Sequence, residues 1–597
     1  MFYISVIFWL LSISSLLVFV TKKRFEIIVP FTYILSVFII YIFTYFNQLR
    51  LGYIITLVIG LLSVIYITFK CLKDNVFKKE FLNNYLTIGT FIFLLLVIYS
   101  FILYQHKGFE ACDEFMHWGT MVRETFRLNG FYSLPESILR THKDYPPFFC
   151  LLETMWCLFA GTYKEPYVYM GLVTFMWSLF MPLFSKYDYR NKKDIVKSFL
   201  LLIAIVLFGL INSRTVTASD WAFMYNTIYV DWTLCIFLGF NLFLIYKNSE
   251  YDKAFYFLLT LSFTTLLFMK QMGLPFYMLS MFYLVLKMCF VDKKKFDINF
   301  LVCTIIVPIL AFITWKHIIS TYGIVGQFNV GETIKSLFDS NKVIDPNLPL
   351  YRPTVFRYFI SQIIKRPLFL HPFKMPFFVV IAIQSIFLIK NNRYLGAVYL
   401  FGSLAYSFTM LILYLFSFSY EEALELASFD RYMNSYLICG FALCLMIAST
   451  KFTSTKSSII IIIVTLLFVE FNNFYQLIPS SNMNKTLFTN VLVVDRKGKE
   501  KEPIDRSDLG GVMINITDDD YIDYQKMTSD EFVEELAKYG AVYVISTDSD
   551  FLNLWNEANL DIDLHNNDLY DIYKLENGLV LNKNFMYLNQ VVFYYYQ

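Results

Sequence analysis

The sequence predicts a mainly α-helical, polytopic membrane protein with a small C-terminal α/β domain. Three observations lead to this fold class. The 597 residues are 57% hydrophobic and 16% charged, whereas a soluble domain carries about 25% charged residues. Apolar runs of about 20 residues, the length of a membrane-spanning helix, recur as far as residue 475. From about residue 485 the composition becomes charged. A soluble enzyme of this length is therefore excluded.

About fourteen apolar runs are long enough to cross a bilayer. The first run lacks a basic leader and a small-residue cleavage site, so we expect a helix there rather than a signal peptide. The stretch 147–161 is only about 15 residues long, and we expect it to lie at the interface or to re-enter the membrane. The expected spans are 2–20, 26–46, 51–69, 85–104, 166–185, 196–212, 230–246, 254–269, 273–290, 298–319, 376–390, 395–418, 432–449 and 457–475.

Basic loops give the expected orientation, because short cytoplasmic loops carry an excess of Lys and Arg. These loops are 22–24, 70–79, 186–197, 247–253, 287–295, 390–393 and 451–456. These loops all lie on one side of the membrane only if the stretch 147–161 does not cross it. The opposite, outward side then carries 105–165, 213–229, 320–375, 419–431 and 477–597. The sequence thus predicts a multi-pass protein of the cell membrane whose long hydrophilic segments and two termini are extracytoplasmic.

The segment 477–597 is expected to fold as a separate α/β domain. Strand-like runs are separated by an amphipathic helix, Ser529–Tyr539, which Ser529 can N-cap with Glu531 in its first turn. A domain of about 110 residues can bury a core of its own. The strand-like runs are Val491–Val494, Gly511–Ile516, Ala541–Ser546 and Leu569–Leu575.

Charge and cysteine content exclude other classes. The net charge of +2 gives no basic field for nucleic acid. The nine cysteines form no CxxC pair and no Cys/His spacing typical of a metal site, so a disulfide framework is not expected.

Ionisable residues at membrane edges are the candidates for function, since their desolvation is costly. Asp113 and Glu114 follow the fourth span, and Asp113 shares a helix face with His117 at the i, i+4 spacing. A carboxylate at the mouth of a bilayer can act as a general base on an acceptor hydroxyl. The alternative is that the two acids only cap a juxtamembrane helix.

A second candidate segment lies just before the short apolar stretch. It combines cationic and acidic side chains with a rigid Pro-Pro pair that fixes the entry of the following helix. An ordinary loop-to-helix junction is the alternative. The residues are His142, Lys143, Asp144 and Tyr145, followed by Pro146 and Pro147.

Three further candidates stand at the outward ends of spans. Asp231 opens the span 230–246, where capping of the helix is the alternative. Lys270 lies in the turn between two spans, and Arg431 begins another. Each cation can snorkel to the interface or hold an anion, and arginine can bind phosphate in a bidentate manner.

In this order the motifs resemble the GT-C glycosyltransferases, most closely the branch of protein O-mannosyltransferases and aminoarabinose transferases. The resemblance covers roughly 85–290. It rests on the acidic pair Asp113-Glu114, the Tyr-Pro-Pro junction at Tyr145, Asp231 at the outer end of a span, and the Lys-x-x-Gly turn that begins at Lys270. Two features depart from the family: four spans precede the acidic loop instead of one, and FMHWG follows the acidic pair.

The resemblance implies an enzyme that transfers a hexosyl or pentosyl group from a polyprenyl-phosphate-linked donor to a cell-surface polysaccharide, glycolipid or protein, usually with inversion. It assigns Asp113 as the base, Glu114 and Asp231 as further acids, and Lys270 and Arg431 as ligands of the lipid phosphate. It also divides the chain into accessory helices 1–84, a catalytic module 85–476 with outer loops 105–165 and 320–375, and the domain 477–597. Substrate-binding candidates are His117, His142, Lys143, Asp144 and Tyr145.

The donor and acceptor chemistry agrees with this assignment. A polyprenyl phosphate stays in the bilayer, so its anionic head must meet a cation at the interface, while a hydroxyl acceptor from water needs a base. No cofactor is expected, although Asp113, Glu114 and Asp231 offer oxygen ligands suited to Mg²⁺ or Mn²⁺, as in the oligosaccharyltransferases. An O-antigen-type polymerase or ligase, or a flippase for a lipid-linked saccharide, is the alternative function.

Overall fold

The computed structural model describes most of the apolar part of the chain and several segments near its C-terminus. The described residues are 2–109, 113–137, 139, 141–211, 224–326, 351–367, 375–451, 454–467, 469, 477–479, 491–494, 527–537, 541–544, 549–558, 568–575 and 578–583. Two compact units are formed. The membrane unit comprises residues 1–105 and 117–479, and the C-terminal unit comprises residues 106–116 and 480–597. Each unit is described by itself.

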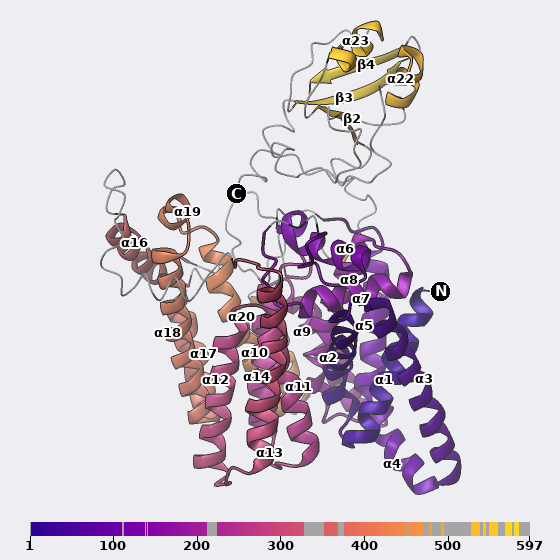
Figure 1. The fold of residues 1–597 in the computed structure, drawn as a ribbon. Helices are drawn as coiled ribbons and strands as arrows, with labels where there is room; N and C mark the ends of the chain where they lie inside the picture. Colours follow the sequence, from indigo (N-terminus) through magenta and orange to yellow (C-terminus); the bar gives the residue numbers. More distant parts are fainter. Residues whose placement is uncertain are drawn as a thin grey trace. The chain divides into compact units, whose positions relative to one another are not determined.

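The membrane unit is built from long apolar helices and shorter connecting ones (Figure 1). Its first half contains α1 (Phe2–Thr21), α2 (Phe25–Thr44), α3 (Leu49–Lys73), α4 (Asn75–Tyr85), α5 (Ile88–Tyr104), α6 (Gly119–Leu128), α7 (Phe148–Ala160), α8 (Glu165–Ser178) and α9 (Lys192–Phe208). A π-helical turn, Glu114–Trp118, precedes α6, and a 3₁₀ turn, Met181–Phe184, follows α8.

The second half of the membrane unit continues the same pattern. It contains α10 (Val230–Lys247), α11 (Lys253–Met269), α12 (Gly273–Leu286), α13 (Ile298–Leu301), α14 (Val307–Thr321), α16 (Arg352–Lys365), α17 (Phe377–Asn391), α18 (Arg393–Phe416), α19 (Tyr420–Glu425), α20 (Phe429–Lys451) and α21 (Thr455–Leu467). The π-helical segments Lys287–Val291 and Val302–Ile306 extend α12 and join α13 to α14.

Each of the fourteen apolar runs contains a helix, but not every helix has the length of a full span. Among the described residues, eight helical segments are long and apolar enough to cross a membrane, and the bent pair α4 and α5 makes a ninth. The helices in the other five runs, α8, α9, α11, α17 and α21, have 14, 17, 17, 15 and 13 residues. The chain is thus a multi-pass helical membrane protein. Helix α7, in the stretch expected not to cross, has 13 residues and is almost wholly buried.

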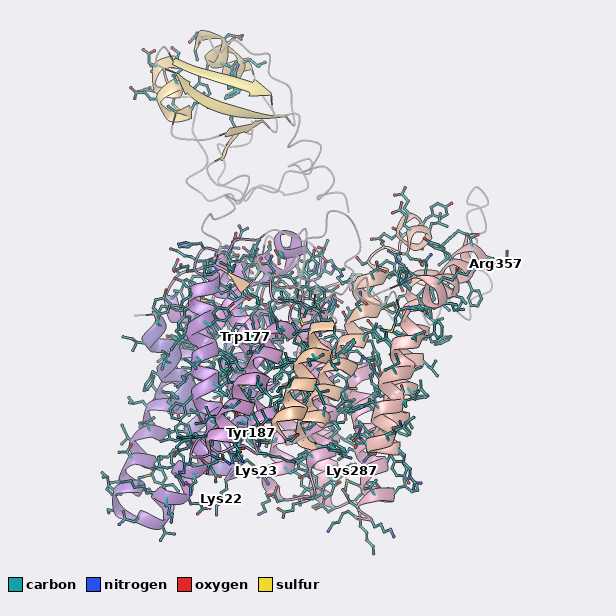
Figure 2. The ribbon with its side chains drawn as sticks, turned by 180° about the vertical axis from the view of Figure 1, so that it is seen from behind. Lys22, Lys23, Trp177, Tyr187, Lys287 and Arg357 are labelled. Carbon is teal, nitrogen blue, oxygen red and sulfur yellow. The ribbon has the colours of Figure 1, made fainter. Side chains whose placement is uncertain are left out.

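The basic loops gather at one end of the membrane unit, which we call the basic end. Figure 2 shows Lys22, Lys23 and Lys287 there, with Arg357 at the other end. Lys23 pairs with Asp252 at 3.0 Å. Further contacts join these loops or residues close to them in the sequence: Asn84 Nδ2 to Lys22 O, Arg24 Nη2 to Tyr187 O, Lys186 Nζ to Thr450 O, Lys287 Nζ to Asn248 O, and the stacked rings of Phe290 and Tyr394. The segments predicted to share one side therefore do share one.

The C-terminal unit contains a four-stranded sheet in the order β1-β2-β3-β4. Strand β1 (Val491–Val494) pairs parallel with β2 (Ala541–Val544), and β3 (Asp568–Leu575) and β4 (Gly578–Lys583) continue the sheet antiparallel. Helices α22 (Ser529–Leu536) and α23 (Ser549–Glu557) pack through Phe532, which is buried against Phe551 and Trp555. Three predicted strand runs and the predicted helix overlap observed elements, whereas Gly511–Ile516 lies outside the described residues. The predicted N-cap is wrong by one residue: Thr528, not Ser529, accepts from Glu531 N at 3.3 Å.

Candidate functional site

A cluster of charged side chains lies at the end of the membrane unit opposite the basic end. Asp231 Oδ1 accepts a hydrogen bond from Lys270 Nζ at 2.5 Å, and Asp231 Oδ2 lies 4.0 Å from Arg431 Nε. The three side chains are only 12%, 14% and 11% exposed. Two cations thus approach one carboxylate in a largely buried setting. An anion would be attracted to such a site more strongly than at an exposed surface.

Close packing of α10 against α20 brings Asp231 and Arg431 together. A Cβ built on Gly239 would lie 3.0 Å from the carbonyl oxygen of Cys439, so the absence of a side chain lets the two backbones approach. Asp231 is in the first turn of α10, and Arg431 is in the first turn of α20. Neighbouring helix starts therefore place the acid beside the arginine.

The turn between α11 and α12 positions Lys270. Gly273 N donates to Lys270 O at 2.8 Å, which closes the predicted Lys-x-x-Gly turn. A Cβ on Gly273 would meet Leu266 O at 1.7 Å, so the turn requires glycine. The next residue, Gln271, donates from Nε2 to Asp144 Oδ2 at 2.5 Å. The turn thereby joins the charged cluster to the loop before α7.

Aromatic rings form one wall beside Lys270. Its ammonium lies 5.6 Å from the ring centroid of Trp118 and 6.0 Å from that of Tyr145, within the range of cation–π attraction. The imidazoles of His117 and His142 stack at 4.2 Å, and His142 meets the Tyr145 ring at 4.6 Å. Three of the predicted substrate-binding residues, His117, His142 and Tyr145, are thus brought together with Lys270.

The His142–Tyr145 segment is a tight turn. Tyr145 N donates to His142 O at 3.1 Å, and the hydroxyl of Tyr132 donates to Tyr145 O. His142 has a φ of 62°, a left-handed conformation that is uncommon for residues other than glycine. Asp144 is buried, and its carbonyl accepts from Trp315 Nε1 at 3.4 Å. The loop is therefore fixed from several elements.

The Lys143 side chain contacts the backbone of the loop between α6 and α7, in which Lys143 lies. Its ammonium donates to the carbonyls of Leu134 and Ser137 at 3.4 and 3.2 Å. Burial lowers the pKa of Lys143, while Glu124 and Glu136 act in the opposite direction. These contacts give Lys143 a role in closing the loop.

Asp113 and Glu114 fall in the segment that belongs to the C-terminal unit. Asp113 is partly exposed, and Glu114 is buried at the start of the π-helical turn.

Two residues near the cluster, Arg366 and Asp430, were not among the candidates from the sequence. Arg366, after α16, donates from Nη2 to Asp430 Oδ2 at 2.8 Å, and Asp430 is fully buried. Arg431, the next residue, lies over the ring of Tyr229 at 4.8 Å. Leu426 and Ser428, with φ of 51° and 60°, turn the chain sharply from α19 into α20. The neighbouring residues Asp430 and Arg431 thus contact different partners, Asp430 contacting Arg366 and Arg431 contacting Asp231.

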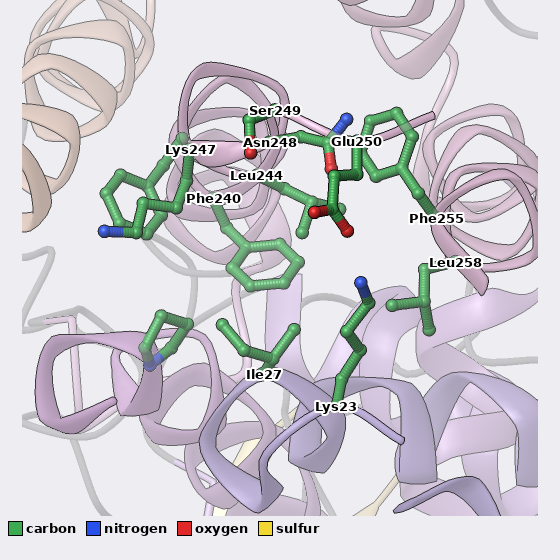
Figure 3. A pocket seen from close by; sticks show the side chains of 12 residues that line it. Lys23, Ile27, Phe240, Leu244, Lys247, Asn248, Ser249, Glu250, Phe255 and Leu258 are labelled. Carbon is green, nitrogen blue, oxygen red and sulfur yellow. The ribbon is translucent and has the colours of Figure 1, made fainter. Parts of the chain in front are cut away.

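No group of three or more His, Cys, Asp or Glu side chains suited to a metal ion occurs in the described part of the chain. A cavity of about 200 Å³ lies at the basic end, between α2, α10 and α11. Figure 3 shows Lys23 and Glu250 approaching one another from opposite walls over Ile27 and Phe240. None of the candidate residues from the sequence lines this cavity.

No protein-family model, curated protein or solved structure matches this chain.

Proposed function

We propose that the protein is a membrane glycosyltransferase that moves a sugar from a polyprenyl-phosphate carrier to a cell-surface polysaccharide, glycolipid or protein. The observation that carries the proposal is the pairing of Lys270 and Arg431 around Asp231 at one end of an apolar helix bundle. A carrier lipid in the bilayer would present its phosphate at this depth. The ammonium of Lys270 and the guanidinium of Arg431 would offset the negative charge that develops on the leaving phosphate.

The transfer requires one base and one leaving group. The acceptor hydroxyl attacks the anomeric carbon of the donor, and the bond from that carbon to the phosphate oxygen breaks with its electron pair. The hydroxyl proton passes to a carboxylate, and the resemblance of the sequence to the GT-C enzymes favours Asp113, which precedes Glu114 in the chain, for this role. Polyprenyl phosphate leaves, and attack from the opposite face inverts the anomeric centre. Asp231 holds Lys270 and Arg431 in position, and the ring wall of His117, His142 and Tyr145 would contact the sugar.

The membrane topology forms part of the proposal. The five helices of 13 to 17 residues connect segments at opposite ends of the unit, as α11 does between Asp252 at the basic end and Lys270 in the cluster. We therefore propose that they also cross, which gives fourteen spans, and that the basic end is cytoplasmic. The cluster and the domain 477–597 are then extracytoplasmic at the cell membrane.

Reporter fusions test this topology. A reporter placed after Lys193 should read as cytoplasmic, and one placed after Gln597 should read as external. Lys193 stands in the predicted cytoplasmic loop 186–197. The measurement is a paired phosphatase and fluorescent-protein fusion at each site. Reversal at either position would contradict the assignment of the cluster to the outer face.

Donor turnover tests the activity. Purified protein in vesicles should release polyprenyl phosphate from a polyprenyl-phosphate-linked sugar when the outer polysaccharide or glycolipid fraction is added. Replacing Asp113 by Asn should slow this release about a hundredfold, as expected for loss of a general base. The exposed Asp188→Asn at the basic end is the control and should keep full activity. Equal rates for the Asp113→Asn variant and the parent would exclude Asp113 as the base, and movement of intact donor across the bilayer without release would favour a flippase.

A further inference from the structure

Helix α16 carries an apolar surface that is exposed among the described residues. It packs against α17, α18 and α19 at the end of the membrane unit that also carries the charged cluster (Figure 1). Its buried face consists of Val355 and Phe359, one turn apart. The Phe359 ring meets the rings of Tyr414 at 5.9 Å and Phe429 at 5.5 Å. This face fixes the helix to the bundle.

A second apolar line runs beside the buried face. Phe356, Ile360 and Ile364 are 48%, 38% and 51% exposed. Residues four apart lie above one another on a helix, so the three side chains form one continuous stripe. Leaving such a stripe in water forgoes the free energy of burying it. An apolar neighbour would therefore stabilise the stripe.

The charges of α16 indicate what that neighbour is. The helix contains Arg352, Arg357 and Lys365 and no acidic residue. Arg357 and Lys365 are exposed. Figure 2 shows Arg357 at the end of the unit remote from Lys22 and Lys287. An apolar stripe on a helix whose other exposed faces carry cations is typical of a helix that lies in the interface of a membrane with anionic lipids.

We propose that α16 binds the bilayer interface, with Phe356, Ile360 and Ile364 among the upper acyl chains and Arg357 and Lys365 at anionic phospholipid headgroups. Helix α18, against which α16 packs, also exposes the apolar side chains of Phe401, Leu404 and Phe408. The proposal does not depend on the transferase activity. It places a lipid-bound helix next to the charged cluster, since Arg366 directly follows α16 and pairs with Asp430.

Fluorescence quenching on the full-length protein tests the proposal. Ile360→Cys and Tyr358→Cys are a matched pair, because the native side chains are 38% and 40% exposed and lie on nearly opposite faces of α16. Each variant is made in a Cys289→Ser background, which removes the exposed cysteine found among the described residues. Each is then labelled with an environment-sensitive fluorophore and reconstituted in vesicles. The signal of the labelled parent is subtracted, and a monodisperse elution profile confirms folding.

The label at position 360 should be blue-shifted and quenched by nitroxide-labelled phospholipid, and the label at 358 should be quenched by aqueous iodide. Adding phosphatidylglycerol to phosphatidylcholine vesicles should increase lipid quenching at 360, and Arg357→Gln with Lys365→Gln should abolish that increase. Iodide quenching of 360 equal to that of 358 would overturn the proposal. Protection of 360 from both quenchers would show that a protein surface covers the stripe, and this too would overturn it. Equal quenching with and without phosphatidylglycerol would refute the role of the cations.

Discussion

Replacing Lys270 by alanine should slow sugar transfer about a thousandfold, the upper range for removal of one group that stabilises developing charge. The change deletes the cation 2.5 Å from Asp231 and leaves that carboxylate facing the incoming phosphate. The formal charge of the Lys270, Asp231 and Arg431 group falls from a surplus of one positive charge to zero. The carrier should therefore bind more weakly, and the phosphate should leave more slowly. The measurement is the rate of polyprenyl phosphate release over a range of donor concentrations.

The chain offers a matched control for this change. Lys197 pairs with Asp194 at 3.0 Å, and the two side chains are 15% and 16% exposed, close to the 14% and 12% of Lys270 and Asp231. Lys197→Ala should keep parental transfer. Binding of polyprenyl phosphate to the purified protein, followed by thermal shift, should be lost in Lys270→Ala and retained in Lys197→Ala. An equal fall of transfer in both variants would show a structural effect, and unchanged donor binding in Lys270→Ala would exclude Lys270 as a phosphate ligand.

The helical architecture could be predicted from sequence because apolar run length is a local property. Each run expected to span contains a helix, and the basic loops predicted to share a side are joined by contacts such as Lys23 with Asp252. The lengths of the individual helices were harder to predict from the sequence. The run 166–185 was expected as one span, but it divides into α8 and a 3₁₀ turn at Met181–Phe184, where Pro182 removes a backbone donor.

The candidate site could be predicted only in part. The sequence placed Asp231, Lys270 and Arg431 on one side of the membrane, but it gave no distances between residues that belong to different helices. The contact of Arg366 with Asp430 joins positions 64 residues apart, with α17, α18 and α19 between them, and no local pattern marks it. Likewise the bond from Gln271 to Asp144 spans 127 residues. Such contacts depend on how helices pack, which here depends on glycines such as Gly239.

The stability of the protein should be sensitive to the loss of either charge in the buried pair of Arg366 and Asp430. Asp430 is fully buried and Arg366 is 19% exposed, so removing either charge leaves its partner largely desolvated. Arg366→Gln and Asp430→Asn should each destabilise the protein by about 3 kcal/mol, the typical cost of breaking a buried pair. The double variant should lose less than the sum of the two, because it leaves no unmatched charge from the pair. The measurement is the apparent unfolding temperature of the purified protein in one detergent.

The Lys23 and Asp252 pair provides the comparison that separates burial from charge loss. These side chains are 32% and 41% exposed, and Lys23→Gln should cost less than about 1 kcal/mol, since water solvates the remaining carboxylate. Both pairs join residues of the same unit that are far apart in the sequence. A difference between the stability losses of Lys23→Gln and Arg366→Gln therefore reflects desolvation of the remaining charge and not the closure of a loop. If Lys23→Gln lowered the unfolding temperature as much as Arg366→Gln, burial would not be the cause. If the double variant lost the full sum, Arg366 and Asp430 would act independently, and the start of α20 would need another anchor to hold Arg431 beside Asp231.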